Sequence, residues 1–174
     1  MNHETETKIR KIEHTSNVVR GVSHALFVPI ALVGVIATVS IIPGWSAHIN
    51  YLGQDFAPAT MPLSSRLILA VVVIATAAVL LKCLHHLRRL AGNYSRREIF
   101  TADSARQIRS FGIGCILWGV VKIVWAFLPL AIPAEHPPVY YATTDTILLG
   151  VIFIGLSWFA EMAAELREEN DLTV

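Results

Sequence analysis

Hydrophobic residues fall into four long runs along the chain, separated by more polar segments. The runs cover residues 22–42, 67–84, 111–132 and 146–162. A helix needs about 20 apolar residues to cross the hydrocarbon core of a bilayer. The pattern therefore predicts an all-α, polytopic membrane protein with four transmembrane helices in an up-down bundle. We expect residues 1–174 to form a single membrane domain, with an outer loop at 43–66 and a cytoplasmic loop at 85–110.

The composition agrees with a membrane protein. Of the 174 residues, 54% are hydrophobic and 16% are charged, and the mean hydropathy is +0.56. The first run has three successors and lies too far from the start of the chain for a removable signal sequence. The formal net charge is only +1, so the chain lacks the basic excess of a nucleic-acid-binding protein. We expect the lipid bilayer as its surroundings and no direct contact with nucleic acid.

Basic residues gather in the segments that the four runs place on one side. Twelve of the fourteen Lys and Arg residues lie on that side: before the first run, after the fourth, or between the second and third, counting Lys82 at the end of the second run. Short loops rich in Lys and Arg stay on the cytoplasmic side of a membrane. We therefore predict that both termini and the loop 85–110 face the cytoplasm. The two exceptions are Arg66 and Lys122.

Two segments on that predicted cytoplasmic side carry opposite charges. Residues 82–109 have a local net charge of +5, and residues 161–171 have one of −4. One hypothesis is that the acidic tail docks on the basic loop and competes there with a partner or with anionic lipid. The alternative is that the loop only obeys the topology rule and the tail is a solvated helix end. The candidate partner-binding residues are Arg96, Arg97, Phe100, Arg106, Arg109, Glu165, Glu168, Glu169 and Asp171.

The basic loop also contains the predicted start of the third helix. Thr101 is placed as its N-cap, with a hydroxyl that accepts from an amide near Ser104. Asp103 in the first turn complements the positive end of the helix dipole. Ile99 and Phe100, just before the cap, are suited to pack back onto the first turn. The helix should thus begin about ten residues before it enters lipid.

Lys122 is the one ionisable residue near the middle of a predicted span. A Lys at that depth costs about 2.5–3.5 kcal/mol on insertion scales, so it should face the bundle or a wet cavity. Trp118 and Trp125 are placed to hold its ammonium by cation–π contact, and Asp145 is its most plausible carboxylate partner. Two interpretations stay open: a gate or ligand counter-ion, or a structural Lys whose charge snorkels toward the interface.

Histidines near the inner helix ends suggest a cofactor site as an alternative. His24, His85 and His86 lie at comparable depth, and helix bundles do hold haem or metal between such side chains. However, the sequence has no HxxxH, CxxC or HExxH spacing, and His85 and His86 point about 100° apart on a helix. We expect no metal and no other cofactor. The sequence also has no GxSxG and no phosphate-binding glycine loop, so we expect no enzymatic activity.

Two parts of the sequence resemble a known family. They are Ile99-Phe100-Thr101 with Ala105, Ile108-Arg109 and Gly112, and the ending Leu166-Arg167-Glu168-Glu169-Asn170-Asp171-Leu172-Thr173-Val174. They resemble the uncharacterised YoaS-like family of small bacterial four-helix membrane proteins. The resemblance implies an inner-membrane protein of unknown activity, often encoded beside a small helix-turn-helix regulator of the Cro/CI type.

The leading functional hypothesis is a non-enzymatic membrane protein that presents its basic loop and acidic tail to a cytoplasmic partner. A small helix-turn-helix transcription regulator is the suggested partner, because acidic residues suit the basic surface of a DNA-binding domain. The alternative is a small transporter or channel that uses Lys122. It would need a homo-oligomer, for which four glycines offer packing surfaces without a strict GxxxG motif. These glycines are Gly112, Gly119, Gly150 and Gly155. A haem- or metal-binding membrane protein is the third hypothesis.

Overall fold

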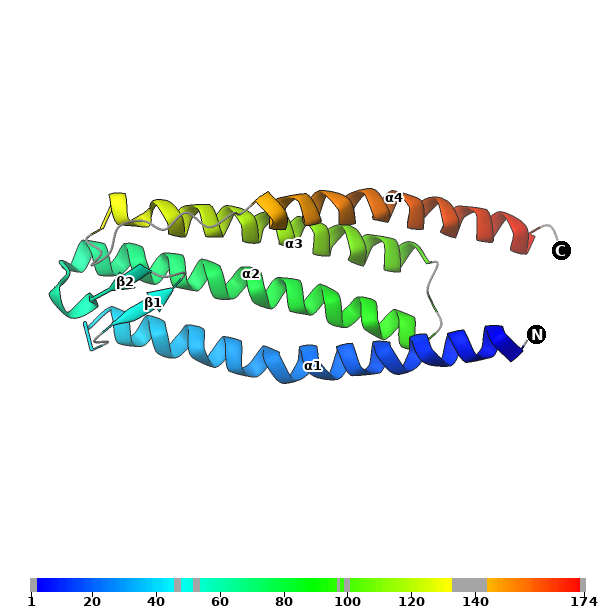
Figure 1. The fold of residues 1–174 in the computed structure, drawn as a ribbon, viewed down its shortest axis with the longest axis horizontal. Coiled ribbons are helices and arrows are strands. Elements are labelled where there is room, and N and C mark those ends of the chain that lie inside the picture. The colour runs from blue at the N-terminus through cyan, green and yellow to red at the C-terminus, as the bar shows by residue number, and fades with distance from the viewer. Residues whose placement is uncertain are drawn as a thin grey trace.

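Four long helices account for most of the protein (Figure 1). A computed structural model describes residues 3–45, 48–51, 54–96, 98, 101–132 and 144–172. The elements are α1 (His3–Ile41), β1 (Ile49–Tyr51), β2 (Gln54–Phe56), the 3₁₀ turn η1 (Pro58–Thr60), α2 (Leu63–Ser95), α3 (Ala102–Phe127), the 3₁₀ turn η2 (Leu128–Leu130) and α4 (Thr144–Leu172). This confirms the prediction of an all-helical fold with four long apolar helices.

The helices pack in chain order. The main contacts join α1 to α2, α2 to α3 and α3 to α4, and Figure 1 shows the four helices side by side with alternating directions. The start of α1, the α2–α3 connection and the end of α4 lie at one end, which we call the terminal end. The strands lie at the opposite end, the hairpin end. Helix α3 packs against both α2 and α4, whereas α1 packs mainly against α2. Accordingly, 33% of the residues in the most apolar stretch of α3 are buried, compared with 6% in that of α1.

The helices extend well beyond the predicted spans. Helix α2 continues to Ser95 and α3 begins at Ala102, so most of the segment predicted as a cytoplasmic loop, 85–110, is helical. The reason is that Leu and Arg, frequent in this stretch, have high helix propensity. The predicted N-cap is confirmed: the Ser104 amide donates to Thr101 Oγ1 over 3.2 Å. Ile99 and Phe100 lie outside the described residues.

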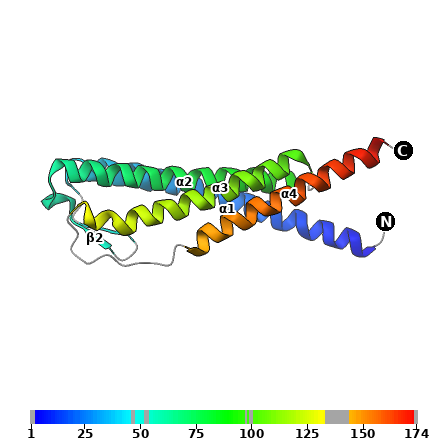
Figure 2. The same ribbon diagram turned by 90° about the horizontal axis from the view of Figure 1, so that it is seen from above.

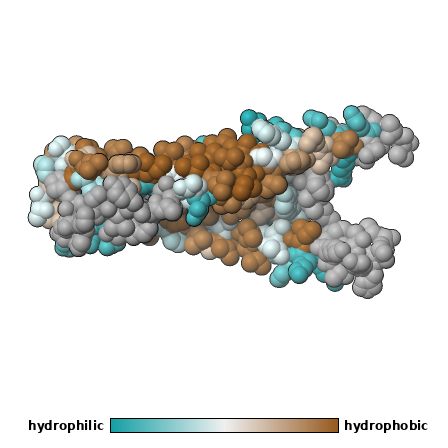
Figure 3. Space-filling view, turned by 45° about the horizontal axis from the view of Figure 1, so that its top comes forward, coloured by the Kyte–Doolittle hydropathy of each residue, from teal (hydrophilic) through white to brown (hydrophobic). Residues whose placement is uncertain are grey.

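The surface of the helices has the character expected in a bilayer. All four helices are long and apolar enough to cross a membrane. Figure 3 shows apolar residues covering the middle of the helices, with hydrophilic residues concentrated toward the terminal end. Many large apolar side chains on the helices are exposed, among them Val33, Val71, Val151 and Phe159. An apolar surface of this extent is stable in contact with lipid rather than with water.

The segment predicted as an outer loop, 43–66, instead contains an antiparallel hairpin and a 3₁₀ turn. Ile49 pairs with Phe56 and Tyr51 with Gln54. Phe56 is fully buried, and its ring lies 5.9 Å from that of Trp125 on α3. The buried core is therefore at the hairpin end, which this segment caps. Its members are Ile41, Phe56, Met61, Leu69, Ala70, Val72, Trp125, Leu128 and Ile132.

Candidate functional site

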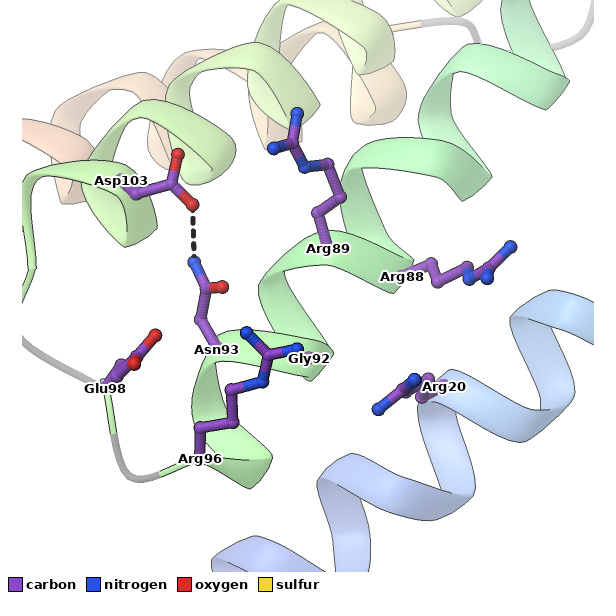
Figure 4. A pocket seen from close by; sticks show the side chains of 8 residues that line it. All are labelled: Arg20, Arg88, Arg89, Gly92, Asn93, Arg96, Glu98 and Asp103. Atoms are coloured by element: carbon purple, nitrogen blue, oxygen red, sulfur yellow. Dashed lines mark hydrogen bonds between the residues drawn. The ribbon is translucent and has the colours of Figure 1, made fainter.

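A polar cleft of about 390 Å³ opens at the terminal end, between α1, α2 and the start of α3. We call it the arginine cleft. Its lining residues are Arg20, Arg88, Arg89, Gly92, Asn93, Arg96, Glu98 and Asp103 (Figure 4). Four arginines and two acidic residues thus line the cleft, which gives its lining a formal charge of +2. Guanidinium groups bind carboxylates and phosphates in a bidentate manner, so the arginine cleft has the chemistry of an anion-binding site.

The spacing of residues on α2 explains why its arginines share one cleft. Arg88, Gly92 and Arg96 are four residues apart, and side chains at that spacing lie on the same helix face. Arg20 extends from the neighbouring α1 toward α2 (Figure 4). A Cβ atom at Gly92 would meet no other atom within 4 Å. Gly92 therefore leaves the middle of the arginine cleft open.

Asn93 ties the end of α2 to the first turn of α3. Its side-chain amide donates to Asp103 Oδ2 over 2.8 Å and to Ser104 Oγ over 3.3 Å. The backbone carbonyl oxygen of Asn93 accepts from the backbone amides of Arg96 and Glu98, both at 3.0 Å. The Asp103 carboxylate also accepts from Gln107 over 3.4 Å. These bonds hold the Asp103 charge against α3, on the side of the arginine cleft away from α1 (Figure 4).

The end of α4 forms a second charged surface. Figure 1 shows that its last turns project beyond the α2–α3 connection. Glu161, Glu165 and Glu169 are exposed on the C-terminal part of α4, and their four-residue spacing places them on one face of the helix. We call these three residues the acidic helix end. The side chains of two other predicted partner-binding residues, Glu168 and Asp171, lie outside the described part of the chain.

The structure describes three of the four arginines predicted to bind a partner, Arg96, Arg106 and Arg109. Arg96 lines the arginine cleft, whereas Arg106 and Arg109 are exposed on α3 outside its lining. Arg97 and the apolar Phe100, which were also predicted to bind a partner, lie outside the described residues.

The structure groups Arg20, Arg88 and Arg89 with Arg96, although the sequence pattern indicates for these three residues only the orientation of the chain. The one local signal for them is the spacing of Arg88, Gly92 and Arg96, which are four residues apart. This spacing has a geometric meaning only in a helix, and the sequence predicts a loop from residue 85 to the Thr101 cap.

Lys122 and Trp125 both lie on α3, and their side chains form hydrogen bonds with different neighbouring helices. The Lys122 ammonium donates to Thr146 Oγ1 of α4 over 3.4 Å. The Trp125 indole is 1% exposed and donates to Thr76 Oγ1 of α2 over 2.8 Å. Asp145, the predicted carboxylate partner, is exposed beside Thr146, and Trp118 is half-buried on α3.

The histidines proposed as an alternative metal site have other surroundings. His86 Nδ1 donates to Gln107 Oε1 over 2.8 Å, which joins α2 to α3. The His85 and His86 rings lie edge to face, with their centroids 5.6 Å apart. His24 is exposed on α1. Within the part of the chain that the structure describes, no three His, Cys, Asp or Glu side chains are grouped as metal ligands.

Comparison with known proteins gives one match. The family described as "Protein of unknown function (DUF2975)" matches residues 23–174, a range that includes α2, α3, α4 and the second half of α1. Searches of curated proteins and of solved structures gave no match.

Proposed function

The chain belongs to the DUF2975 family of proteins of unknown function, and from that premise we propose that it is a non-enzymatic integral membrane protein that presents its terminal end to a cytoplasmic protein partner. The observation that carries this proposal is the acidic helix end. Three exposed carboxylates lie on one face of a helix that projects beyond the rest of the helices. Complementary charge selects and orients a partner, so the partner should have a basic surface.

A small helix-turn-helix transcription regulator is the proposed partner. DNA-binding domains carry a basic face for the phosphate backbone, and the acidic helix end offers the opposite charge. The YoaS-like resemblance points to the same class of protein, encoded by a neighbouring gene. Binding at the membrane would occupy the face of the regulator that contacts DNA and would lower its effective concentration at its operators.

The proposal places the protein in the inner membrane of a bacterium, with its terminal end in the cytoplasm. In support, the terminal end gathers the segments that carry most Lys and Arg residues, as expected for the cytoplasmic side. Single cysteines test this orientation in a chain whose native Cys83 and Cys115 are replaced by Ala. In intact cells, a membrane-impermeant maleimide should label Ala59→Cys at the hairpin end and leave Glu165→Cys unlabelled until the membrane is opened. The reverse pattern would refute the orientation.

The partner is tested by co-expression with the regulator encoded by the neighbouring gene, fused to a fluorescent protein. The regulator should move to the membrane fraction with the wild-type protein and stay soluble when Glu161, Glu165 and Glu169 are all replaced by Gln. Asp55→Asn with Asp145→Asn is the matched control, because it removes acidic charge on residues outside the acidic helix end. Retention of the regulator in the cytosol with the wild-type protein would refute the partner. Equal loss in the control would refute the site.

A further inference from the structure

The contact between α1 and α2 contains a second hollow besides the arginine cleft. This apolar groove has a volume of about 380 Å³. Residues from both helices, from α3 and from β1 line it, among them Pro29, Val33, Ile49, Val73, Leu80 and Trp125. It lies within the apolar stretches of α1 and α2, whereas the arginine cleft lies at the terminal end.

The two hollows follow the same side of α2. Ala77, which lines the apolar groove, and Arg88, which lines the arginine cleft, are eleven residues apart. Eleven residues are close to three full helical turns, so the two side chains share a face. Leu80 and Arg88 are about 12 Å apart along the helix axis at 1.5 Å per residue. The α1–α2 contact therefore presents a cationic site and, beginning about two turns deeper on α2, an apolar site in line with it.

A ligand that fits both hollows has an anionic head and an apolar chain. Guanidinium groups recognise phosphate oxygens through paired hydrogen bonds, and arginines just cytoplasmic of a span attract anionic lipid headgroups. Of the two carboxylates that line the arginine cleft, that of Asp103 accepts hydrogen bonds from Asn93 and Gln107 and is held by them. An acyl chain that descends from the arginine cleft would meet the apolar walls of the groove.

We propose that the α1–α2 contact binds one anionic phospholipid, with its phosphate between Arg20 and the arginines of α2 and its acyl chain along the apolar groove. This inference does not depend on the partner protein. It requires only that the helices span a bilayer. Failure of the partner experiment would therefore leave the lipid proposal intact, and failure of the lipid experiments would leave the partner proposal intact.

Native mass spectrometry of the full chain in detergent tests the preference for an anionic lipid. The probes are phosphatidylglycerol and phosphatidylcholine with identical acyl chains. We expect the wild-type protein to retain one phosphatidylglycerol in preference to phosphatidylcholine, and equal retention would overturn the proposal. Thermal melting with dioctanoyl phosphatidylglycerol or with free glycerol phosphate separates a lipid site from a site for soluble phosphate. Only the lipid should raise the melting temperature, and an equal rise with glycerol phosphate would overturn the lipid assignment.

Two pairs of substitutions separate a defined site from general surface charge. Arg88→Gln with Arg89→Gln should weaken phosphatidylglycerol binding about tenfold, since charge-assisted bonds to phosphate are lost. Arg106→Gln with Arg109→Gln removes the same charge from exposed positions outside the cleft lining and should change the affinity less than about twofold. Equal losses would show that lipid responds to diffuse charge and would overturn the proposal.

Gly92→Leu provides a test that leaves every charge in place. A Cβ atom at Gly92 would lie in open space, so Gly92→Leu places an apolar side chain in the arginine cleft that Gly92 lines and raises helix propensity. The space beside Gly155 on α4 is also open, and Gly155→Leu is the matched control. We expect Gly92→Leu to abolish the preference for phosphatidylglycerol and Gly155→Leu to preserve it. A full preference in Gly92→Leu would overturn the proposed position of the phosphate.

Discussion

Gly112 of α3 and Gly150 of α4 bring the two helix backbones into direct contact. A Cβ atom at Gly112 would lie 2.8 Å from the carbonyl oxygen of Gly150, and one at Gly150 would lie 2.7 Å from that of Gly112. Gly119 of α3 packs against the side chain of Ile147 on α4. Helices in lipid associate largely through close van der Waals packing of small residues. Three of the four glycines considered for a homo-oligomer are therefore used between helices of the same chain.

Gly150→Ala should destabilise the contact between α3 and α4. The added methyl group meets a backbone oxygen, which cannot rotate away, so the helices must separate. Overpacking of this kind costs about 1–3 kcal/mol. The free energy of unfolding in mixed micelles, followed by circular dichroism during titration with SDS, measures the effect. Gly155→Ala is the control, because the space beside Gly155 is open. An equal effect of the two substitutions would show that the close contact is not limiting.

The hydrogen bond between Trp125 and Thr76 should couple α3 to α2. Thr76 Oγ1 accepts from the indole over 2.8 Å and donates to the Val72 carbonyl over 2.7 Å. A double-mutant cycle with Trp125→Phe and Thr76→Val isolates this bond. Hydrogen bonds between membrane helices contribute about 0.6 kcal/mol on average and at most about 1.7 kcal/mol, and we expect a coupling energy within that range. Additive effects of the two substitutions would contradict the coupling.

The Thr101 cap should protect the first turn of α3. Thr101→Ala removes the acceptor for the Ser104 amide, and loss of such a cap costs about 0.5–2 kcal/mol. Amide hydrogen exchange should become faster in the first turn of α3, while the exchange of its central residues stays unchanged. Thr101→Ser keeps a hydroxyl at the same position and should exchange like the wild type. Fast exchange in the serine variant would show that the methyl group, not the cap, stabilises the turn.

Replacement of Lys122 by Met should raise the melting temperature. Among the residues that the structure describes, the ammonium has one long hydrogen bond, 3.4 Å to Thr146, whereas a Lys in the middle of a span costs about 2.5–3.5 kcal/mol on insertion scales. Lys82→Met is the control, since Lys82 is exposed nearer the terminal end and its removal should change the melting temperature less. The transporter alternative predicts instead that Lys122 is needed for activity. It requires charge-dependent flux into liposomes above the protein-free background, with loss of that flux in Lys122→Gln.

Local rules explain the features that the sequence determined by itself. A long apolar run is helical in a bilayer because its backbone polar groups have no other partners there. That rule predicted the four helices, and the short-range geometry of a helix N-terminus predicted the Thr101 cap. The uneven distribution of Lys and Arg identified the end of the molecule that carries most of the charge. Each of these features depends on residues that are close together in the chain.

Tertiary structure decided which helix faces meet. Arg20 joins Arg88 in one cleft because α1 packs against α2 in one particular rotation, and residues 68 positions apart leave no shared local pattern. The same holds for Gly112 with Gly150, and for Trp125, which turns to Thr76 rather than to Lys122. Apolar periodicity specifies that a helix has lipid-facing and buried sides, but nearly every face of these helices is apolar. Their rotations are set by close packing of small residues and by a few buried polar contacts between distant parts of the chain.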